Sequence, residues 1–482
     1  MRADVSFSPA DRRFLVDARP EAEDHEERWN GGVVFVDLPE GVDEPHPDLQ
    51  ALATILVLVP FVGRRLVLDV PLSEQFAAAC RAALPFDVET TQSSSTVTAR
   101  AAGPRPGLAF SGGVDSTAAL AVMPTDTVAV FLDRVAGTGQ RPSRLYVKDS
   151  ALAACDMVEA LGYETYRVRS NLEHVRRPVG FPVDWANGVP AVLLADHLGL
   201  GSVSWGMVAE SGYRVGHASF VELTDRAIYT RWSALLLGAG LEFGAPVAGV
   251  SEVGTTLVES RSRLAGVGQS CIRGPKGQPC LSCAKCLRKS LLDAAIKGRT
   301  VPAAEVEHLL RAPGTDTILL GSPIKHENVY RWLAPRLEVT GASAAWDALR
   351  RRLTEPVVEV DWCSRWYEPS AAVIPGHFRD ETVASIGTFL DPMTPADRAA
   401  FASWDLVPAL RSEVVHRSVV NLSERLAELR PEPQQKPKAP TATPAPAAAP
   451  VARAPRTRVH RRWVRGALRR ARAVVRRVRG HG

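Results

Sequence analysis

The stretch Leu108-Ala109-Phe110-Ser111-Gly112-Gly113-Val114-Asp115-Ser116-Thr117 decides the fold of this chain of 482 residues. Its apolar residues predict the end of a buried strand, its two glycines a tight turn, and the alanine-rich run that follows a helix. A strand that passes through a glycine turn into a helix gathers backbone N–H groups in one concavity, at the positive end of the helix dipole. The stretch therefore predicts a phosphate-binding loop.

Two commoner phosphate loops do not fit this spacing. The Walker loop requires a lysine that is not present, and the dinucleotide fingerprint requires a third glycine where this chain has Ser116. The pattern resembles the Ser-Gly-Gly-x-Asp-Ser loop of the PP-loop, or N-type, ATP pyrophosphatases. This resemblance implies an adenine nucleotide alpha-hydrolase-like fold. It also implies that ATP is cleaved between its α- and β-phosphates with Mg²⁺, and that AMP passes to an acceptor carbonyl or carboxylate.

The resemblance also assigns roles within the loop. The residues expected to bind the nucleotide are Ser111, Gly112, Gly113, Val114, Asp115, Ser116 and Thr117. Asp115 and Ser116 are in addition the expected catalytic residues, and the Asp115 carboxylate would hold the metal against departing pyrophosphate. The alternative is a tight strand-to-helix turn that binds no ligand.

Strand and helix patterns alternate from Leu108 onward, which predicts a doubly wound, mostly parallel α/β sheet covered on both faces. Ligands on such sheets bind at the carboxyl ends of the strands. That edge would bring Asp133, Asn171 and the segment 206–213 close to the loop. Asp133 and Glu210 are candidates for Mg²⁺ or substrate contacts, and helix capping is the alternative for each.

Composition divides the chain into five regions. These are a small N-terminal α/β domain (1–100), the PP-loop domain (101–300), a mostly helical region (301–430), a Pro/Ala-rich linker (431–455) and an Arg-rich tail (456–482). In the helical region, the segment 322–327 and the aromatic residues Trp362, Trp366 and Tyr367 could form a lid. Core packing and helix capping are the favoured interpretation of both.

Four of the seven cysteines form the pattern Cys271-x8-Cys280-x2-Cys283-x2-Cys286. Zn²⁺ prefers four thiolates in a tetrahedron, and cysteines two residues apart on a turn supply that geometry. The spacing predicts a closed, structural zinc site, with an iron–sulfur cluster as the alternative. The cations that could offset the negative charge of four thiolates are Arg273, Lys276, Lys285, Arg288 and Lys289.

Together, the loop and the cysteine knuckle resemble the 7-cyano-7-deazaguanine synthase family over residues 105–295. The sequences Cys286-Leu287-Arg288 and Pro246-Val247 also resemble that family. Two departures matter. Glu252 stands where the family has lysine, and Tyr213-Arg214-Val215-Gly216-His217 replaces the Tyr-Pro-Asp-Cys-Arg segment that meets the deazapurine. ATP handling is therefore expected to transfer to this chain, whereas the deazaguanine substrate is not.

The net charge of +5 conceals an asymmetry, because residues 451–482 hold twelve arginines and no acid. Apolar residues recur at helical spacing in the tail 456–482, which predicts a basic amphipathic helix for an anionic membrane surface. Nucleic acid is the rival partner, and a solvated charge run is the third interpretation. The polar N-terminus and the absence of a long apolar run predict a cytoplasmic protein, peripheral at the membrane.

Three functions remain open from the sequence. The leading one is an ATP-dependent ligase that adenylates a small-molecule acceptor, releases pyrophosphate and completes an amide- or amidine-type bond. The second is a PP-loop enzyme that modifies tRNA or another nucleic acid. The third is an ATP-binding interaction protein without turnover. The expected cofactors are ATP, Mg²⁺ and Zn²⁺, and the sequence predicts neither the acceptor nor the oligomeric state.

Overall fold

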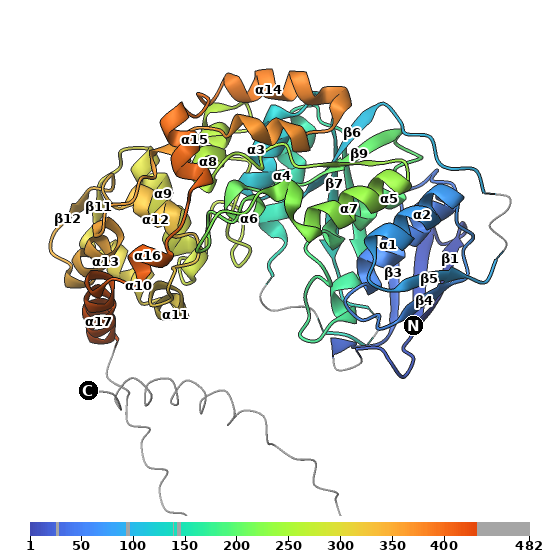
Figure 1. Ribbon diagram of the computed structural model, residues 1–482, viewed down its shortest axis with the longest axis horizontal. Coiled ribbons are helices and arrows are strands. Elements are labelled where there is room, and N and C mark those ends of the chain that lie inside the picture. Colours follow the sequence, from blue (N-terminus) through green and yellow to red (C-terminus); the bar gives the residue numbers. More distant parts are fainter. Residues whose placement is uncertain (26–27, 93–96, 138, 142–145, 431–482) are drawn as a thin grey trace, which may run out of the picture. The chain divides into compact units, whose positions relative to one another are not determined.

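The computed structural model describes residues 1–25, 28–92, 97–137, 139–141 and 146–430 (Figure 1). Residues 1–430 form one compact unit. At its centre is a ten-stranded sheet in the order β10-β9-β6-β7-β8-β3-β2-β1-β4-β5. The expected linker 431–455 and tail 456–482 lie outside the described residues.

One half of the sheet is entirely parallel. It consists of β6 (Arg105–Phe110), β7 (Val128–Arg134), β8 (Thr165–Ser170), β9 (Leu200–Ser204) and β10 (Glu242–Gly244). The chain moves outward from β6 through β7 to β8, then returns to place β9 and β10 on the other side of β6. The strand order therefore reverses between β6 and β9, the position at which open α/β sheets bind ligands.

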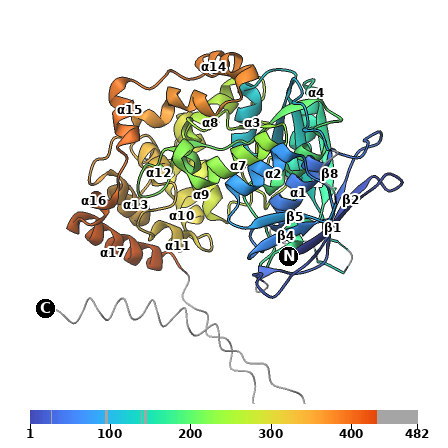
Figure 2. The same cartoon turned by 45° about the vertical axis from the view of Figure 1, so that its right-hand side comes forward.

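Alternate residues of the central strands enter two different cores. Ala109 and Val130 belong to one core, and Leu108, Phe110 and Phe131 to the other. The first face is covered by α1 (Pro47–Leu58), α2 (Glu74–Ala83), α5 (Val189–Leu193) and α7 (Ala227–Gly238). The opposite face is covered by α3 (Val114–Val122), α4 (Asp149–Ala160), α8 (Glu252–Arg261) and α14 (Arg379–Gly387). In Figures 1 and 2, α1, α2 and α7 lie side by side. The predicted α/β class with a large, mostly parallel sheet is confirmed.

The N-terminal strands continue the same sheet. They are β1 (Arg2–Ser8), β2 (Arg13–Arg19), β3 (Val33–Asp37), β4 (Arg65–Leu68) and β5 (Asp87–Thr90). β3 pairs antiparallel with β8 through only Val36 with Ser170 and Asp37 with Arg169. The amide of Asn171 extends this short junction. Its Nδ2 donates to the carbonyl of Val33 at 2.9 Å, and its Oδ1 accepts from the N–H of Phe35 at 2.9 Å.

Helices dominate the chain after the cysteine cluster. They are α9 (Ala284–Ile296), α10 (Ala303–Leu310), α11 (Thr315–Leu319), α12 (Glu327–Leu333), α13 (Ala344–Thr354), α15 (Pro395–Ala402), α16 (Val407–Leu410) and α17 (Glu413–Glu428). A small sheet pairs β11 (Val301–Pro302) with β12 (Val339–Thr340). Trp362 is fully buried against Phe401 and Trp404, at ring-centroid distances of 5.0 and 5.6 Å. Trp362, Trp366 and Tyr367 are therefore core residues.

The segment between α5 and β9 is not one continuous helix, because α5 ends at Leu193 and hydrogen-bonded turns continue to Gly199. The apolar run that begins at Ala51 forms most of α1, which is almost completely buried. Among the described residues, no helix is both long and apolar enough to cross a bilayer.

We expect Asn171→Ala to weaken the junction between β3 and β8. The substitution removes two hydrogen bonds to backbone groups, which should lower the free energy of unfolding by roughly 2–4 kcal/mol. Urea unfolding measures the loss. The control is Asn421→Ala on α17, which should change stability by less than about 0.5 kcal/mol. Equal effects of the two variants would contradict the role of Asn171.

Candidate functional site

The predicted loop connects β6 to α3 and has the expected strand–turn–helix geometry. Gly112 has φ +70°, and a Cβ at this position would lie 2.9 Å from the Cα of Ala151. Glycine is therefore required here on two grounds. The hydroxyls of Ser111 and Ser116 lie 2.9 Å apart, and Ser116 Oγ also accepts the N–H of Ser111 at 3.2 Å and donates to the carbonyl of Gly113 at 3.0 Å.

The N-terminus of α3 has no side-chain cap. Its N-cap residue is Gly113, which offers no side-chain oxygen, and the helical ladder begins with the N–H of Thr117 donating to the carbonyl of Gly113 at 2.9 Å. The preceding N–H groups belong to Val114, Asp115 and Ser116, all of which line a pocket. Unpaired helix N–H groups next to a pocket favour an anionic ligand.

This pocket has a volume of about 470 Å³ and lies where the strand order reverses. Besides the loop, it is lined by Trp205 and Gly206, which directly follow β9, and by Trp185, Lys285 and others. Gly206 lies so close to α3 that a Cβ would come within 2.7 Å of the Cα of Ser116. The carboxyl end of β9 thus packs directly against the start of α3.

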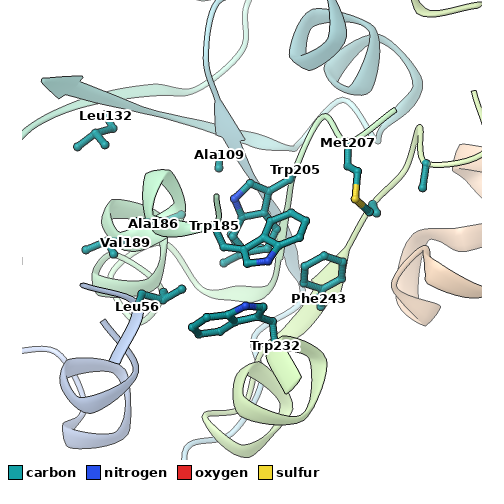
Figure 3. Packing of buried hydrophobic residues seen from close by; sticks show 14 of the residues in the cluster. Leu56, Ala109, Leu132, Trp185, Ala186, Val189, Trp205, Met207, Trp232 and Phe243 are labelled. Carbon is teal, nitrogen blue, oxygen red and sulfur yellow. The ribbon is translucent and has the colours of Figure 1, made fainter. Parts of the chain in front are cut away.

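An aromatic cluster supports one wall of the pocket. Trp205 stacks on Phe243 with 5.2 Å between ring centroids, and Trp185 meets both rings edge-on at 5.3 and 5.1 Å (Figure 3). The indole N–H of Trp205 donates to Asn187 Oδ1 at 2.9 Å, which fixes the ring. Met207 lies beside this cluster and also lines the pocket. The pocket therefore combines a polar loop with a flat apolar wall.

Asp115, at the pocket, is held by two elements that are distant in sequence. Its Oδ1 accepts from the hydroxyl of Thr255 on α8 at 2.8 Å and lies 3.4 Å from Nζ of Lys289 on α9. Lys289 also lies 3.2 Å from Oε1 of Glu252. Arg288 binds the same carboxylate through two hydrogen bonds, of 2.9 and 3.1 Å. A buried ion network therefore joins α3, α8 and α9.

Electrostatics keep this network charged despite its burial. Burial alone would raise the pKa of Glu252, but Lys289 and Arg288 outweigh it and hold that pKa well below its usual range. Burial likewise opposes the charge of Lys289, yet the carboxylates of Asp115 and Glu252 raise its pKa. His326 lies 3.4 Å from Glu252, and burial together with the positive charge of Arg288 lowers its pKa to about 3, so its imidazole is neutral.

Glu210 is a second buried carboxyl group. It accepts the N–H of Glu252 at the start of α8, at 3.1 and 3.0 Å, and Nδ2 of Asn328 at 2.7 Å. Burial first, and then the negative charge of Glu252, raise the pKa of Glu210 to about 7. Its position makes it a cap of α8, the alternative considered for it from the sequence.

The other residues expected near the crevice have structural contacts. Asp133 forms an ion pair with Lys148, with oxygens 2.9 and 3.0 Å from Nζ. The amide of Asn171 is engaged in the junction between β3 and β8. The partners of these residues come from segments that strand order alone does not specify.

The four cysteines of the predicted knuckle come together. The sulfurs of Cys271, Cys280, Cys283 and Cys286 all lie within 4.8 Å of one another, and those of Cys280 and Cys286 are 3.7 Å apart. A tetrahedron with metal–sulfur bonds of about 2.3 Å places its sulfurs roughly 3.8 Å apart, so the cluster could hold a metal such as zinc. Two backbone N–H groups, of Arg273 and Cys280, donate to Sγ of Cys271 at 3.5 and 3.3 Å, an arrangement that favours a thiolate.

The cluster also fixes the start of α9. Cys283 is the N-cap of this helix, and Cys286 lies in its first turn. The cations Arg288 and Lys289 farther along α9 are committed to Glu252, and Lys276 donates to the carbonyls of Gly266 and Val267. Three of the five cations that could offset the thiolates therefore have other partners in the fold.

Sequence reasoning missed several residues of the site. Thr255 and the pairing of Glu252 with α9 were not anticipated, because the partners are distant in sequence. The pocket residues Trp185 and Arg226 were also missed, and His217 was noted only as part of the segment 213–217. Only a three-dimensional fold brings Thr255, Trp185 and Arg226 to the loop, so the sequence contained no local signal for them.

One family model matches part of the chain. Residues 231–405 match a family of unknown function, DUF6395. This segment includes α8, the four cysteines, α9 and α12, but it excludes the loop between β6 and α3. No curated protein and no solved structure matches the chain.

We expect Cys283→Ser to abolish metal binding at the cluster. The purified chain should carry one zinc, and the variant should lose that metal together with several kcal/mol of stability, because binding free energy at such sites is folding free energy. Elemental analysis and thermal unfolding measure both effects. The control Cys155→Ala, at a buried cysteine outside the cluster, should keep its zinc. Iron with labile sulfide, or no metal in the wild-type chain, would contradict the zinc site.

The raised pKa of Glu210 predicts a distinct dependence of stability on pH. An unfolded glutamate ionises near pH 4.5, whereas Glu210 in the folded chain keeps its proton until about pH 7. Its contribution to stability is therefore complete below pH 4.5 and is lost as pH rises to 7, a decline of about 3 kcal/mol. Glu210→Gln should flatten this decline in urea unfolding, whereas the exposed Glu424→Gln should not. An unchanged decline in Glu210→Gln would contradict the assignment.

Proposed function

We propose that the chain cleaves ATP between its α- and β-phosphates and transfers AMP to a carboxylate or carbonyl of a small molecule. The observation that carries this proposal is the pocket of about 470 Å³ at the strand-order reversal, which combines the uncapped N-terminus of α3 with an aromatic wall. An adenine nucleotide needs both an anion site and a flat apolar surface. The Ser-Gly-Gly-x-Asp-Ser pattern supports cleavage between the α- and β-phosphates, because it resembles the loop of the N-type ATP pyrophosphatases.

Each part of the pocket has a function in this proposal. The N–H groups at the start of α3 and the hydroxyls of Ser111 and Ser116 would bind phosphate oxygens. The indoles of Trp185 and Trp205 would cover the adenine or ribose. Lys285 also lines the pocket, one residue before the cluster cysteine Cys286, so the cysteine knuckle would hold a cation beside the phosphates.

The proposed reaction is an in-line displacement at the α-phosphorus. An acceptor oxygen forms a bond to this phosphorus while the bond to the bridging oxygen of the β-phosphate breaks, and the electron pair leaves with pyrophosphate. The nitrogen of an amine or ammonia then forms a bond to the activated carbon of the acceptor and loses a proton to solvent. The bond between this carbon and the phosphate oxygen breaks, and AMP leaves with the electron pair. Positioning and charge stabilisation supply most of the acceleration in phosphoryl and nucleotidyl transfer. The N–H groups of α3 and the ammonium of Lys285 would meet the developing charge.

Asp115 is the carboxylate assigned to Mg²⁺. The ion, when bound with ATP, would neutralise charge on the leaving pyrophosphate. The contacts of Asp115 with Thr255 and Lys289 both engage Oδ1, and they fix the orientation of the carboxylate. Because Lys289 is itself bound by Glu252, the α8–α9 ion network positions Asp115.

We expect ATP with Mg²⁺ to bind one site per chain. In the presence of a small-molecule extract it should be converted into AMP and pyrophosphate. Asp115→Asn keeps the size of the side chain but removes its charge, so it should lower the rate at least a hundredfold while the melting temperature stays within a few degrees. Calorimetry and ³¹P NMR measure binding and products.

The matched control is Asp149→Asn, an aspartate in the first turn of α4 that does not line the pocket. This variant should bind and convert ATP as the wild type does. Release of ADP and orthophosphate, or equal loss in the two variants, would contradict the proposal.

A further inference from the structure

Three cationic side chains and one imidazole gather at one side of the pocket. His217 and Arg226 line it directly, and Arg214 and Lys325 lie next to them. They come from three segments: the loop after α6 (Ala209–Gly212), the residue that precedes α7, and the segment before α12. We call Arg214, His217, Arg226 and Lys325 the cationic rim.

Backbone hydrogen bonds hold the rim segments together. The N–H of His217 donates to the carbonyl of Arg214 at 2.8 Å, and the N–H of His326 donates to the carbonyl of Gly216 at 3.0 Å. The second bond places Lys325 beside the loop that carries Arg214. The guanidinium of Arg226 donates to the carbonyl of Gly212 at 2.6 Å and also to that of Ser211. The rim is therefore organised by the main chain before any ligand binds.

The rim charges are not compensated within the described part of the chain. None of its ion pairs, defined by N···O distances up to 4.0 Å, involves a rim residue. Burial and the positive charges of Arg214, Lys325 and Arg226 lower the pKa of His217. Burial and Arg214 likewise lower the pKa of Arg226. Like charges thus act on one another here, which is unfavourable for the empty pocket and favourable for a bound anion.

We propose that the cationic rim binds an anionic group, a phosphate or carboxylate, of the small-molecule acceptor. This inference rests on the proposed function, because it names the chemistry of the second substrate in the same pocket. The phosphates of ATP have their own partners in the α3 N-terminus, the loop hydroxyls and Lys285. The rim belongs to other segments and offers the pocket additional positive charge. An acceptor whose anionic group lies apart from its reacting atom could bind to the rim while ATP occupies the loop and Lys285.

The test uses the full chain and inorganic phosphate as the probe. Phosphate is titrated by calorimetry at low ionic strength, with and without saturating α,β-methylene-ATP and Mg²⁺. The wild type loaded with this analogue should bind one phosphate. The double variant Arg214→Ala/Lys325→Ala should weaken that binding at least tenfold and leave the affinity for the analogue within twofold.

The control Arg350→Ala/Arg417→Ala removes the same charge from exposed positions on α13 and α17. It should leave phosphate binding unchanged, which separates a rim site from an effect of net charge. Thermal unfolding confirms that both double variants remain folded.

Three results would overturn the proposal. Loss of analogue affinity in the rim variant, without a phosphate site in the loaded wild type, would assign the rim to the triphosphate. Displacement of phosphate by a short RNA but not by small anions would assign it to nucleic acid. Equal weakening of phosphate binding in the rim and control variants would show that net charge alone, and no site at the rim, attracts phosphate. If the chain binds no nucleotide, the proposed function fails, and the titration without nucleotide still tests the rim.

Discussion

The buried carboxylate of Glu252 is the constraint on which the site depends. A buried ion left without its partners costs several kcal/mol, so Glu252 requires Arg288 and Lys289 in place. These cations lie on α9, whose first turn is fixed by the cysteine cluster, and Lys289 reaches Asp115 at the start of α3. The cysteine cluster and the loop are therefore coupled through one chain of contacts, although they lie more than 150 residues apart.

This network also bears on the presence of Glu252 where the family that the sequence resembles has lysine. Lysine is the family's residue at the position of Glu252, and its replacement by a glutamate reverses a charge close to the loop. In this chain Lys289 lies between Glu252 and Asp115, at 3.2 and 3.4 Å from their oxygens. A positive charge from α9 therefore faces Asp115. The proposed binding of an anion at the loop is compatible with Glu252 for this reason.

The features that the sequence predicted are those whose contacts join residues close together along the chain. The loop, its flanking strand and helix, and the four cysteines depend on neighbours within about fifteen residues, and the sequence patterns located them. β1 and β2 were missed although Ala3 and Val5 alternate with polar residues, a period-two signal in a charged segment. The continuation of the sheet at β3 and β8 depends on two residue pairs and the amide of Asn171, which no local pattern specifies.

The residues of the cationic rim could be seen in the sequence, but their role could not be predicted from it. Arg214 and His217 were visible as a departure from the family that the sequence resembles, but a charged loop is usually solvated and paired. The role of a cationic side chain depends on its neighbours in the fold. A cation next to a carboxylate stabilises the structure, whereas a cation that faces only other cations favours an anionic ligand. Arg288 is an example of the first case and Arg226 of the second. The same residue type thus stabilises the fold on one side of the pocket and favours a ligand on the other.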